Sequence, residues 1–425
     1  MKRIIVLYFT VLFLFGCSTD IYKGELLGSL NRPNWYHIMP YGMVYVPSGT
    51  LHIGPSDQDV NSSLVQRAKS VSVAGFYMDQ TEISNNEYRQ FVEWVRDSIA
   101  HHLIGDEHLV ENASGNEVIN WKRQIQWGDE EVIDALEDMY YAESDRFWGK
   151  RLINPDVLNY EYSYIDYKDA AKNEYRRRNG LPLKTRGELI KEESVNVYPD
   201  TLVWIRDFTY SYNEPMTRNY FWHPSYDNYP VVGVTWKQAH AFTIWRTKFM
   251  NDWREMLAEL PVDNFRLPNE FEWEYASRGG QPLNPYPWGG PYLRNSKGCL
   301  LSNFKPGRGN YPDDGGFYTV KVNSYWPNDF GLYNMAGNVA EWTADAFEEN
   351  AVSFQHDLNG TYTYNATSED INTLKRKSLR GGSWKDISYY LQSGTRTYEY
   401  ADSAKSYIGF RCVMSFLGRS INDEY

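Results

Sequence analysis

The chain has 425 residues, of which 42% are hydrophobic and 23% charged, so it is long and apolar enough to bury a core and is not disordered. Its 43 basic and 55 acidic residues leave a net charge of −12, and because an acidic surface repels phosphate backbones we expect no nucleic-acid partner. The three cysteines, Cys17, Cys299 and Cys412, are too few for a disulfide framework or a CxxC metal cluster.

Residues 1–16 have the pattern of a signal peptide. Lys2 and Arg3 precede an apolar run from Ile4 to Phe15, which a single Thr interrupts and which is shorter than the roughly 20 residues that cross a bilayer. The run ends in Leu-Phe-Gly-Cys, which resembles the lipobox of bacterial lipoproteins. We therefore predict a mature chain that begins at Cys17, is lipidated there, and continues as a polar tether over residues 17–40. Because no acidic run follows the cysteine, we expect anchoring at the periplasmic face of the outer membrane.

Short strands and three capped helices are predicted beyond the tether. Apolar and polar residues alternate in four short runs, which predict strands that pair as hairpins: residues 43–47, 51–54, 71–73 and 76–78. A capping box begins each predicted helix, with these pairs as its two members: Ser84 and Glu87, Thr235 and Gln238, Asn269 and Glu272. Since strands and helices do not alternate as βαβ units, we expect an α+β fold rather than a doubly wound sheet.

The segment from about residue 98 to 228 is charge-dense and rich in Tyr, and we interpret it as a partly helical insertion. Its His101, His102 and His108 lack the spacing of metal ligands, because consecutive side chains diverge on a helix, and we expect them in solvated loops. Aromatic residues are enriched at interfaces, so six of them are candidates either for contact with a partner or for packing on the core: Trp121, Trp127, Tyr140, Tyr141, Phe147 and Trp148.

Six motifs follow one another in the C-terminal half. They are YPVVGVTW (229–236), FRLPNEFEWEYA (265–276), YPWG (286–289), GLYNMAGNVAEW (331–342), RGGSW (380–384) and GFR (409–411). In this order they resemble the motifs of the formylglycine-generating-enzyme, or sulfatase-modifying factor, family. The resemblance covers residues 41–416 apart from the insertion, and leaves 417–425 as a tail. It implies an α+β fold similar to that of C-type lectins, with little regular secondary structure.

The resemblance also implies where an oxidase of this family would bind copper. Two cysteines hold the metal in such enzymes, at the second and seventh positions after the Trp of the RGGSW motif. Those positions are Asp386 and Leu391 in this chain. Thiolates suit Cu(I), and neither a carboxylate nor an isobutyl group replaces a pair of them. We therefore expect a pseudoenzyme without copper, in which Cys299 and Cys412 are structural thiols.

The resemblance also implies calcium as a cofactor, because this chain has residues that match the family's calcium ligands. The turn within GLYNMAGNVAEW offers side-chain and carbonyl oxygens, which are the ligands that Ca²⁺ prefers. The family's first site maps to the side chains of Asn334 and Glu341 and to the carbonyls of Gly337 and Val339. Its second site maps to Asn303, the carbonyl of Phe304, and Asp314, where an added Gly changes the spacing.

A narrower resemblance exists within the family. The lipobox, the insertion after the first helix and four segments are similar to the lipoproteins of gliding motility and type IX secretion: residues 40–49, 54–59, 78–92 and 94–98. The resemblance implies a non-catalytic structural lipoprotein that self-associates into a periplasmic ring, together with a periplasmic N subunit. The alternatives are an active oxidase of the formylglycine-generating type and a lectin-like binding protein.

Overall fold

The computed structural model describes residues 38–54, 68–111, 115–210, 213–307, 312, 316–367 and 369–418, which belong to one unit, Ile38–Gly418. The predicted signal peptide, Cys17, most of the tether, Asp314 and nearly all of the predicted tail lie outside these residues. No helix among the described residues is long and apolar enough to cross a membrane.

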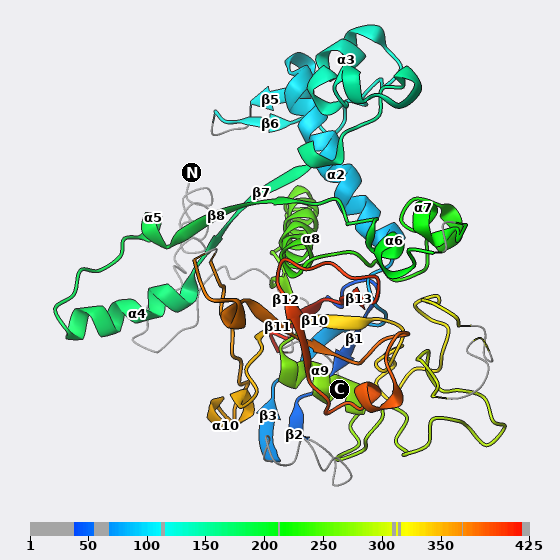
Figure 1. The fold of residues 1–425 in the computed structure, drawn as a ribbon. Coiled ribbons are helices and arrows are strands. Elements are labelled where there is room, and N and C mark those ends of the chain that lie inside the picture. The colour runs from blue at the N-terminus through cyan, green and yellow to red at the C-terminus, as the bar shows by residue number, and fades with distance from the viewer. Residues whose placement is uncertain are drawn as a thin grey trace, which may run out of the picture. The chain divides into compact units, whose positions relative to one another are not determined.

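Two four-stranded sheets form the centre of the fold (Figure 1). The first has the order β1 (Met43–Val46), β4 (Phe76–Asp79), β14 (Val413–Ser415), β9 (Phe265–Arg266), and all its pairs are antiparallel. The second has the order β12 (Thr397–Tyr400), β11 (Arg376–Arg380), β10 (Ala340–Ala346), β13 (Ile408–Gly409). Only β10 and β13 pair in parallel in the second sheet.

The four predicted N-terminal strands exist, but their pairing is nested. β2 (Gly49–Ile53) pairs with β3 (Lys69–Val73), and the outer strands β1 and β4 pair around them. Only β2 and β3 therefore form a hairpin, whereas β1 and β4 close a loop that contains it. The burial of β4 explains this arrangement, because all four of its residues are buried and need a partner on both edges.

The three predicted capped helices are confirmed: α2 (Asn85–Ile104), α8 (Trp236–Met256) and α9 (Glu270–Arg278). Each begins with the predicted capping box, in which the side chains of the cap residue and of the third helical residue satisfy each other's backbone N–H groups. α9 ends at Gly279, whose φ of 60° is the left-handed conformation that glycine adopts at little cost.

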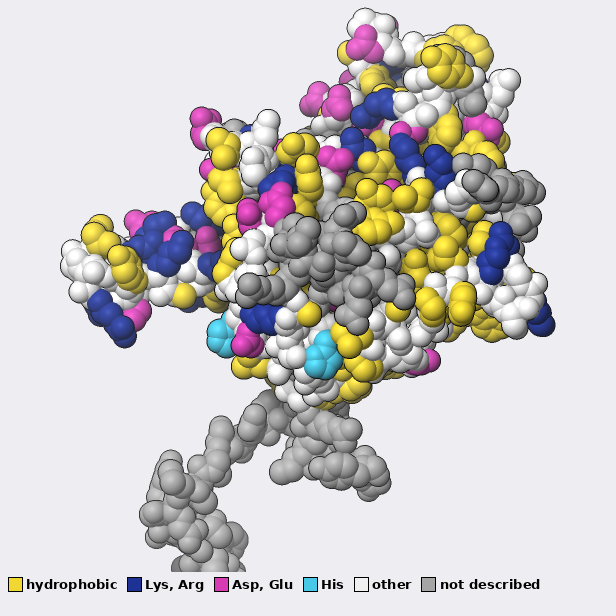
Figure 2. Space-filling view, turned by 60° about the horizontal axis from the view of Figure 1, so that its bottom comes forward, with side chains coloured by type: hydrophobic (Ala, Val, Ile, Leu, Met, Phe, Trp, Pro, Cys, Tyr) yellow, Lys and Arg dark blue, Asp and Glu magenta, His cyan; other side chains and the backbone are white. Residues whose placement is uncertain are grey.

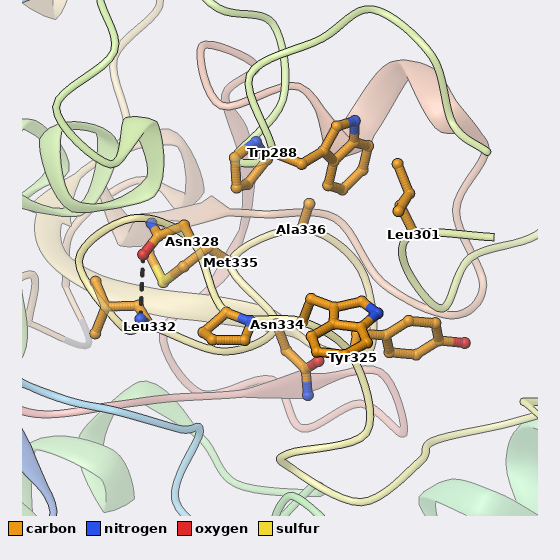
Figure 3. A pocket seen from close by; sticks show the side chains of 11 residues that line it. Trp288, Leu301, Tyr325, Asn328, Leu332, Asn334, Met335 and Ala336 are labelled. Carbon is orange, nitrogen blue, oxygen red and sulfur yellow. Dashed lines mark hydrogen bonds between the residues drawn. The ribbon is translucent and has the colours of Figure 1, made fainter. Parts of the chain in front are cut away.

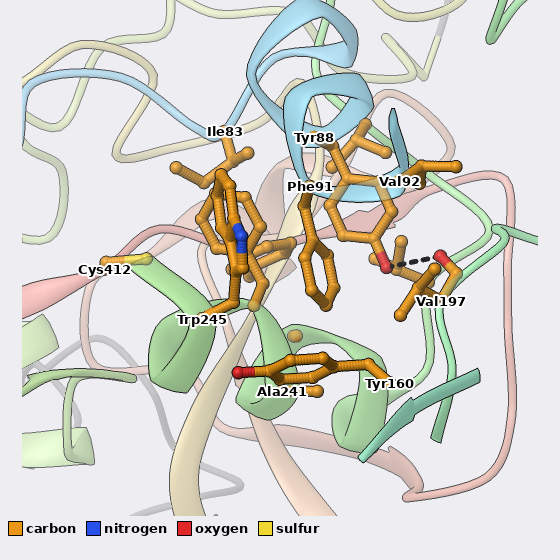
Figure 4. Close-up of a cluster of buried hydrophobic side chains, with 14 of the residues drawn as sticks. Ile83, Tyr88, Phe91, Val92, Tyr160, Val197, Ala241, Trp245 and Cys412 are labelled. Carbon is orange, nitrogen blue, oxygen red and sulfur yellow. Dashed lines mark hydrogen bonds between the residues drawn. The ribbon is translucent and has the colours of Figure 1, made fainter. Parts of the chain in front are cut away.

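The main hydrophobic core lies between α2 and α8 (Figure 4). Tyr88 stacks on Phe242 with ring centroids 5.7 Å apart, and Phe91 lies 5.1 Å from Trp245. The Tyr88 hydroxyl donates a 2.9 Å hydrogen bond to the carbonyl of Val197, which belongs to the predicted insertion. The insertion is therefore partly integrated into the core rather than attached to its surface.

α2 runs six residues past the predicted start of the insertion, and the insertion then forms two parts. The first is here named the distal lobe (residues 107–157) and begins within η2 (Asp106–His108). It also contains β5 (Leu109–Glu111), β6 (Glu117–Ile119), α3 (Glu130–Ala135), η3 (Glu137–Met139), η4 (Glu143–Asp145), η5 (Phe147–Gly149) and η6 (Pro155–Val157). The second, here named the arm (residues 159–196), contains β7 (Asn159–Ile165), α4 (Tyr167–Arg178), α5 (Arg186–Leu189) and β8 (Ile190–Asn196).

Short elements complete the chain. They are α6 (Val203–Asp207), α7 (Met216–Asn219), η7 (Pro224–Tyr226), α10 (Ala351–Phe354), η8 (Asn372–Lys375) and η9 (Ser388–Leu391).

The expectation of solvated loop histidines is wrong for two of the three residues. His101 lies on α2 and His108 on η2, and both side chains are buried. Their Nδ1 atoms are 2.8 Å apart and share one hydrogen bond. The pair forms because the chain turns back at Gly105, so that residues seven apart face each other; His102 remains exposed.

Buried ion pairs fix α9 against the second sheet. Glu274 of α9 accepts from Arg278 at 2.7 Å and from Arg380 of β11 at 2.9 Å, and the side chains of all three residues are at most 4% exposed. Because each charge has left water, its partner is needed to offset the cost of desolvation.

We expect Glu274→Ala to lower the free energy of unfolding by about 3–5 kcal/mol, because Arg380 loses a partner that it cannot replace with water. Asp252→Ala is the control, since Asp252 pairs with Lys248 at a site where both side chains are 53% exposed, and its loss costs at most about 0.5 kcal/mol. Urea denaturation of both variants measures the difference. Equal stability of the two variants would contradict this role of the buried pair.

Candidate functional site

The RGGSW motif forms the turn that follows β11. Gly381 and Gly382 have φ values of 92° and 66°, and a side chain on Gly382 would come within 2.7 Å of the carbonyl oxygen of Tyr390. Trp384 is held from both sides: its backbone N–H donates to the carbonyl of Asn338 and its indole N–H to the carbonyl of Ser406. The turn therefore places the segment after Trp384, which contains Asp386 and Leu391, against the GLYNMAGNVAEW loop.

Asp386 stabilises this turn. Its Oδ2 accepts a 2.6 Å hydrogen bond from the hydroxyl of Ser383, and its backbone carbonyl accepts one of 2.8 Å from the N–H of Lys305. Burial raises the pKa of the Asp386 carboxyl. The carboxylate is thus engaged within its own turn.

Leu391 occupies the second position at which the family resemblance implies a copper ligand, and its side chain is fully buried. It belongs to an apolar cluster with Tyr286, Leu300, Phe304 and Ala336. A hydrocarbon side chain thus fills the space that a second thiolate would need, and no side chain of this cluster is a ligand for Cu(I).

The two cysteines among the described residues form no disulfide and lie in different environments. Cys299 is exposed, whereas Cys412 is buried between β13 and β14. Burial raises the pKa of the Cys412 thiol well above its usual range, which suppresses the reactive thiolate. Neither cysteine adjoins Asp386 or Leu391 in the sequence, and the described residues offer no pair of thiols.

The loops that carry the predicted calcium ligands lie next to each other. Asn334, Gly337 and Asn338 all have positive φ, at 50°, 77° and 61°, and they turn the chain tightly between Gly331 and β10. The N–H of Asn338 donates to the carbonyl of Asn303 at 2.8 Å, and a side chain on Gly337 would come within 2.3 Å of that carbonyl oxygen. The structure thus brings Asn303 of the second predicted site beside the first.

Glu341 is already occupied by other partners. Its carboxylate accepts from both Nε and Nη2 of Arg411, at 2.7 and 2.6 Å, and from the indole N–H of Trp273 at 2.7 Å. All three side chains are fully buried. A Ca²⁺ ion bound here by Glu341 would therefore share the carboxylate with a guanidinium.

Glu82 is the acidic residue that the sequence analysis missed. It lies just before the cap of α2, is fully buried, and accepts from the side-chain amides of Asn334 at 3.1 Å and Asn338 at 2.9 Å. Burial raises the pKa of Glu82 to about 8, against the opposing effect of Arg411. An acidic residue between a buried strand and a helix cap is the signal that could have found it.

Two hollows lie near these loops. The first holds about 50 Å³ and is lined by side chains that include Trp288, Tyr325, Trp326, Asn328 and Asn334 (Figure 3). It is much smaller than the roughly 300–1,000 Å³ of typical ligand pockets. The second holds about 400 Å³ and borders the cluster around Leu391, with which it shares Leu300 and Phe304. These hollows contain no converging set of acidic, histidine or cysteine side chains, in agreement with the absence of any such group of three among the described residues.

Comparison with known proteins identifies the family. The model of the sulfatase-modifying factor enzyme 1-like domain matches residues 37–416. The formylglycine-generating enzyme of Mus musculus is 25% identical over 381 residues, which are 88% of this chain and 75% of that protein. The inactive C-alpha-formylglycine-generating enzyme 2 of Bos taurus is 33% identical over 191 residues, which are 44% of this chain and 50% of that protein. The solved structure of PvdO from Pseudomonas aeruginosa superimposes with a TM-score of 0.47 at 15% identity and covers 88% of this chain and 94% of that one.

The chain belongs to the formylglycine-generating-enzyme, or sulfatase-modifying factor, family. The predicted fold class is confirmed: a mixed α+β fold with little regular secondary structure. The relatives include both active enzymes and an inactive paralogue, so family membership alone leaves activity open.

Proposed function

We propose that the chain is a non-catalytic structural lipoprotein of the type IX secretion and gliding-motility machinery, similar to the lipoprotein K called PorK or GldK. The support is the lipobox at Cys17, the similarity of the segments between residues 40 and 98, and the long insertion after the first helix. In this proposal the lipid anchors the chain to the periplasmic face of the outer membrane, and the folded part self-associates into a ring with a periplasmic N subunit.

The surroundings of Asp386 and Leu391 carry the non-catalytic part of the proposal. A copper oxidase of this family needs two thiolates at these positions. Here one position holds a carboxylate that binds its own turn, and the other holds a leucine packed in an apolar cluster. Because the leucine is integrated in the packing, the position has been converted from a ligand into a part of the core.

The insertion supports the assembly part of the proposal. Phe147 and Trp148 stack with ring centroids 4.7 Å apart and are 66% and 81% exposed. Exposed aromatic residues of this kind form the centres of protein interfaces. In contrast, Trp121 stacks on Trp94 of α2, so part of the predicted aromatic set packs within the chain.

We also propose that the loop around Asn334 binds a structural Ca²⁺. The candidate donors are the side-chain oxygen of Asn334, the carbonyls of Gly337 and Val339 and the carboxylate of Glu82, while Glu341 remains shared with Arg411. The amide of Asn334, whose nitrogen faces Glu82, would turn so that its oxygen faces the ion. A bound cation would add positive charge next to buried Glu82, whose side-chain hydrogen-bond partners are the neutral amides of Asn334 and Asn338. Asn303, Phe304 and Asp314 belong to the second proposed site, of which Asp314 lies outside the described residues.

The copper prediction uses purified, fully reduced protein. We expect the unmodified chain to bind no stoichiometric Cu(I), because the paired thiolates are absent. The variant with Asp386→Cys and Leu391→Cys serves as the comparison, and its titration measures whether the loop can still bring two thiolates together. Stoichiometric Cu(I) binding by the unmodified chain, lost when its cysteines are alkylated, would favour the alternative of an active oxidase.

The anchoring prediction concerns Cys17. We expect Cys17→Ser to release the protein from salt-washed outer membranes, because the serine carries no acyl chains, whereas Cys299→Ser should stay bound.

The assembly prediction uses affinity purification of the tagged, lipidated protein, which should yield a large assembly with one periplasmic partner. A Cys17→Ser protein that still sediments quantitatively with outer membranes would contradict the anchor, and a lone lipidated monomer would contradict the assembly role.

The calcium prediction uses thermal unfolding with and without chelator. A ligand at a hundredfold excess over its Kd adds about 2.7 kcal/mol, so chelation should lower the Tm by several degrees. Glu82→Ala should remove the effect of Ca²⁺ on the Tm. Glu341→Ala is the matched comparison: it lowers the Tm with and without chelator, because it leaves Arg411 buried without its partner. Identical melting curves with and without chelator, for protein first shown to contain calcium, would contradict the site.

A further inference from the structure

The arm projects from the rest of the described residues as a two-stranded hairpin with α4 and α5 between its strands (Figure 1). Its tip, residues 166–191, contains eight basic and four acidic residues, a net charge of +4 in a chain whose net charge is −12. Figure 2 shows Lys and Arg side chains beside hydrophobic ones on this projecting segment. The arm tip is thus a basic and partly apolar surface on an acidic protein.

The arm tip exposes two aromatic side chains and several basic ones to solvent. Tyr167 and Tyr175 of α4 are 72% and 64% exposed. The acidic Asp169 is held within the tip by Arg176 and Lys184, which keep its pKa at about 2. The exposed Lys172 and Arg186 take part in no ion pair among the described residues, so the outward charge of the tip is positive.

The distal lobe has the opposite charge. Residues 107–157 contain twelve acidic and five basic residues, a net charge of −7. The lobe also exposes Phe147, Trp148 and Leu152. Trp148 has a φ of 53°, a conformation that costs energy for any residue except glycine and that persists only where it is held in place. The lobe is thus an acidic segment that also exposes aromatic side chains.

The two surfaces do not cover each other within one copy. No hydrogen bond or ion pair found between described residues joins the arm tip to the distal lobe; the ion pairs of each, such as Arg177 with Glu174 and Arg146 with Glu137, stay inside it. Each surface therefore retains its charge and its exposed aromatic residues for another molecule.

We propose that the arm tip of one copy binds the distal lobe of the next copy. Aromatic and arginine side chains form the energetic centre of such interfaces, and opposite charges steer the encounter and fix the register. Because the two surfaces differ, the contact is heterologous, and repetition of it generates a closed ring or an open filament. This inference rests on the self-association in the proposed function and names the surfaces that carry it.

A second copy explains both surfaces at once. A nucleic acid or an anionic membrane would neutralise the arm tip but would repel the distal lobe. An identical chain supplies one acidic lobe for each basic arm tip, with exposed aromatic residues on both. The contact should therefore weaken as salt increases, since the charges on both surfaces lie in water.

The test uses the full chain with Cys17→Ser, so that no lipid contributes to association. An arm variant carries Lys172→Glu and Arg186→Glu, and a lobe variant carries Asp138→Lys and Glu143→Lys; all four residues are exposed. The control variant, Lys297→Glu with Lys321→Glu, makes the same charge change as the arm variant at exposed sites outside the insertion. Sedimentation velocity over a concentration series at low and high salt measures the association constant.

We expect self-association of the unmodified and control proteins, weakened by salt, and a loss of at least tenfold in the association constant for the arm and lobe variants alone. Mixing the two variants should restore association, because the reversed arm then meets a reversed lobe and the native arm a native lobe. Misfolding would not be repaired by mixing. Self-association that neither variant changes would overturn this contact and leave the proposed function standing. A monomer under all conditions would overturn this contact, and it would overturn the proposed function as well if affinity purification of the lipidated protein also yielded no assembly.

Discussion

Arg411 connects three segments of the chain in a fold that has little regular secondary structure. Its guanidinium binds Glu341 of β10, and it also donates to the backbone carbonyls of Asp79, at the end of β4, and of Tyr333. Both central sheets and the loop before β10 thus converge on one fully buried cation. In a fold in which long loops replace helices and strands, such charged junctions define the relative positions of the sheets, because removing either partner leaves an uncompensated charge in the interior.

The two loops that carry the RGGSW and GLYNMAGNVAEW motifs are joined by a separate set of contacts. The RGGSW turn and the GLYNMAGNVAEW loop remain packed as one unit, through the bond from Trp384 to Asn338 and the apolar cluster around Leu391. Asp386 and Leu391 both take part in this packing, one through Ser383 and the other through the apolar cluster.

Local signals predicted the helices, and distant contacts explain most of what the sequence could not predict. The three capping boxes are short-range patterns, and they placed the starts of α2, α8 and α9 correctly. The pairing of β1 with β4 depends instead on burial at both edges of β4, which alternation along the strand does not reveal.

The candidate site shows the same division. Counting from the RGGSW motif identified Asp386 and Leu391, but only their neighbours in space showed that one binds Ser383 and the other packs in a core. The burial of Glu82 and the contact between His101 and His108 were likewise invisible, because each depends on residues that the fold brings together from separate turns or segments.

The closure of the arm has a consequence for how this protein can vary. The N–H of Asp166 donates to the carbonyl of Leu189 at 2.9 Å, so the hairpin is already closed at the point where α4 and α5 leave it. Tyr160 and Val197, near the base, are buried in the main core. Changes beyond Asp166 therefore leave the main core in place and alter the surface that the tip offers to other molecules, whereas changes at the base alter the scaffold itself. Related chains should therefore agree at the base, and differ at the tip where they assemble differently.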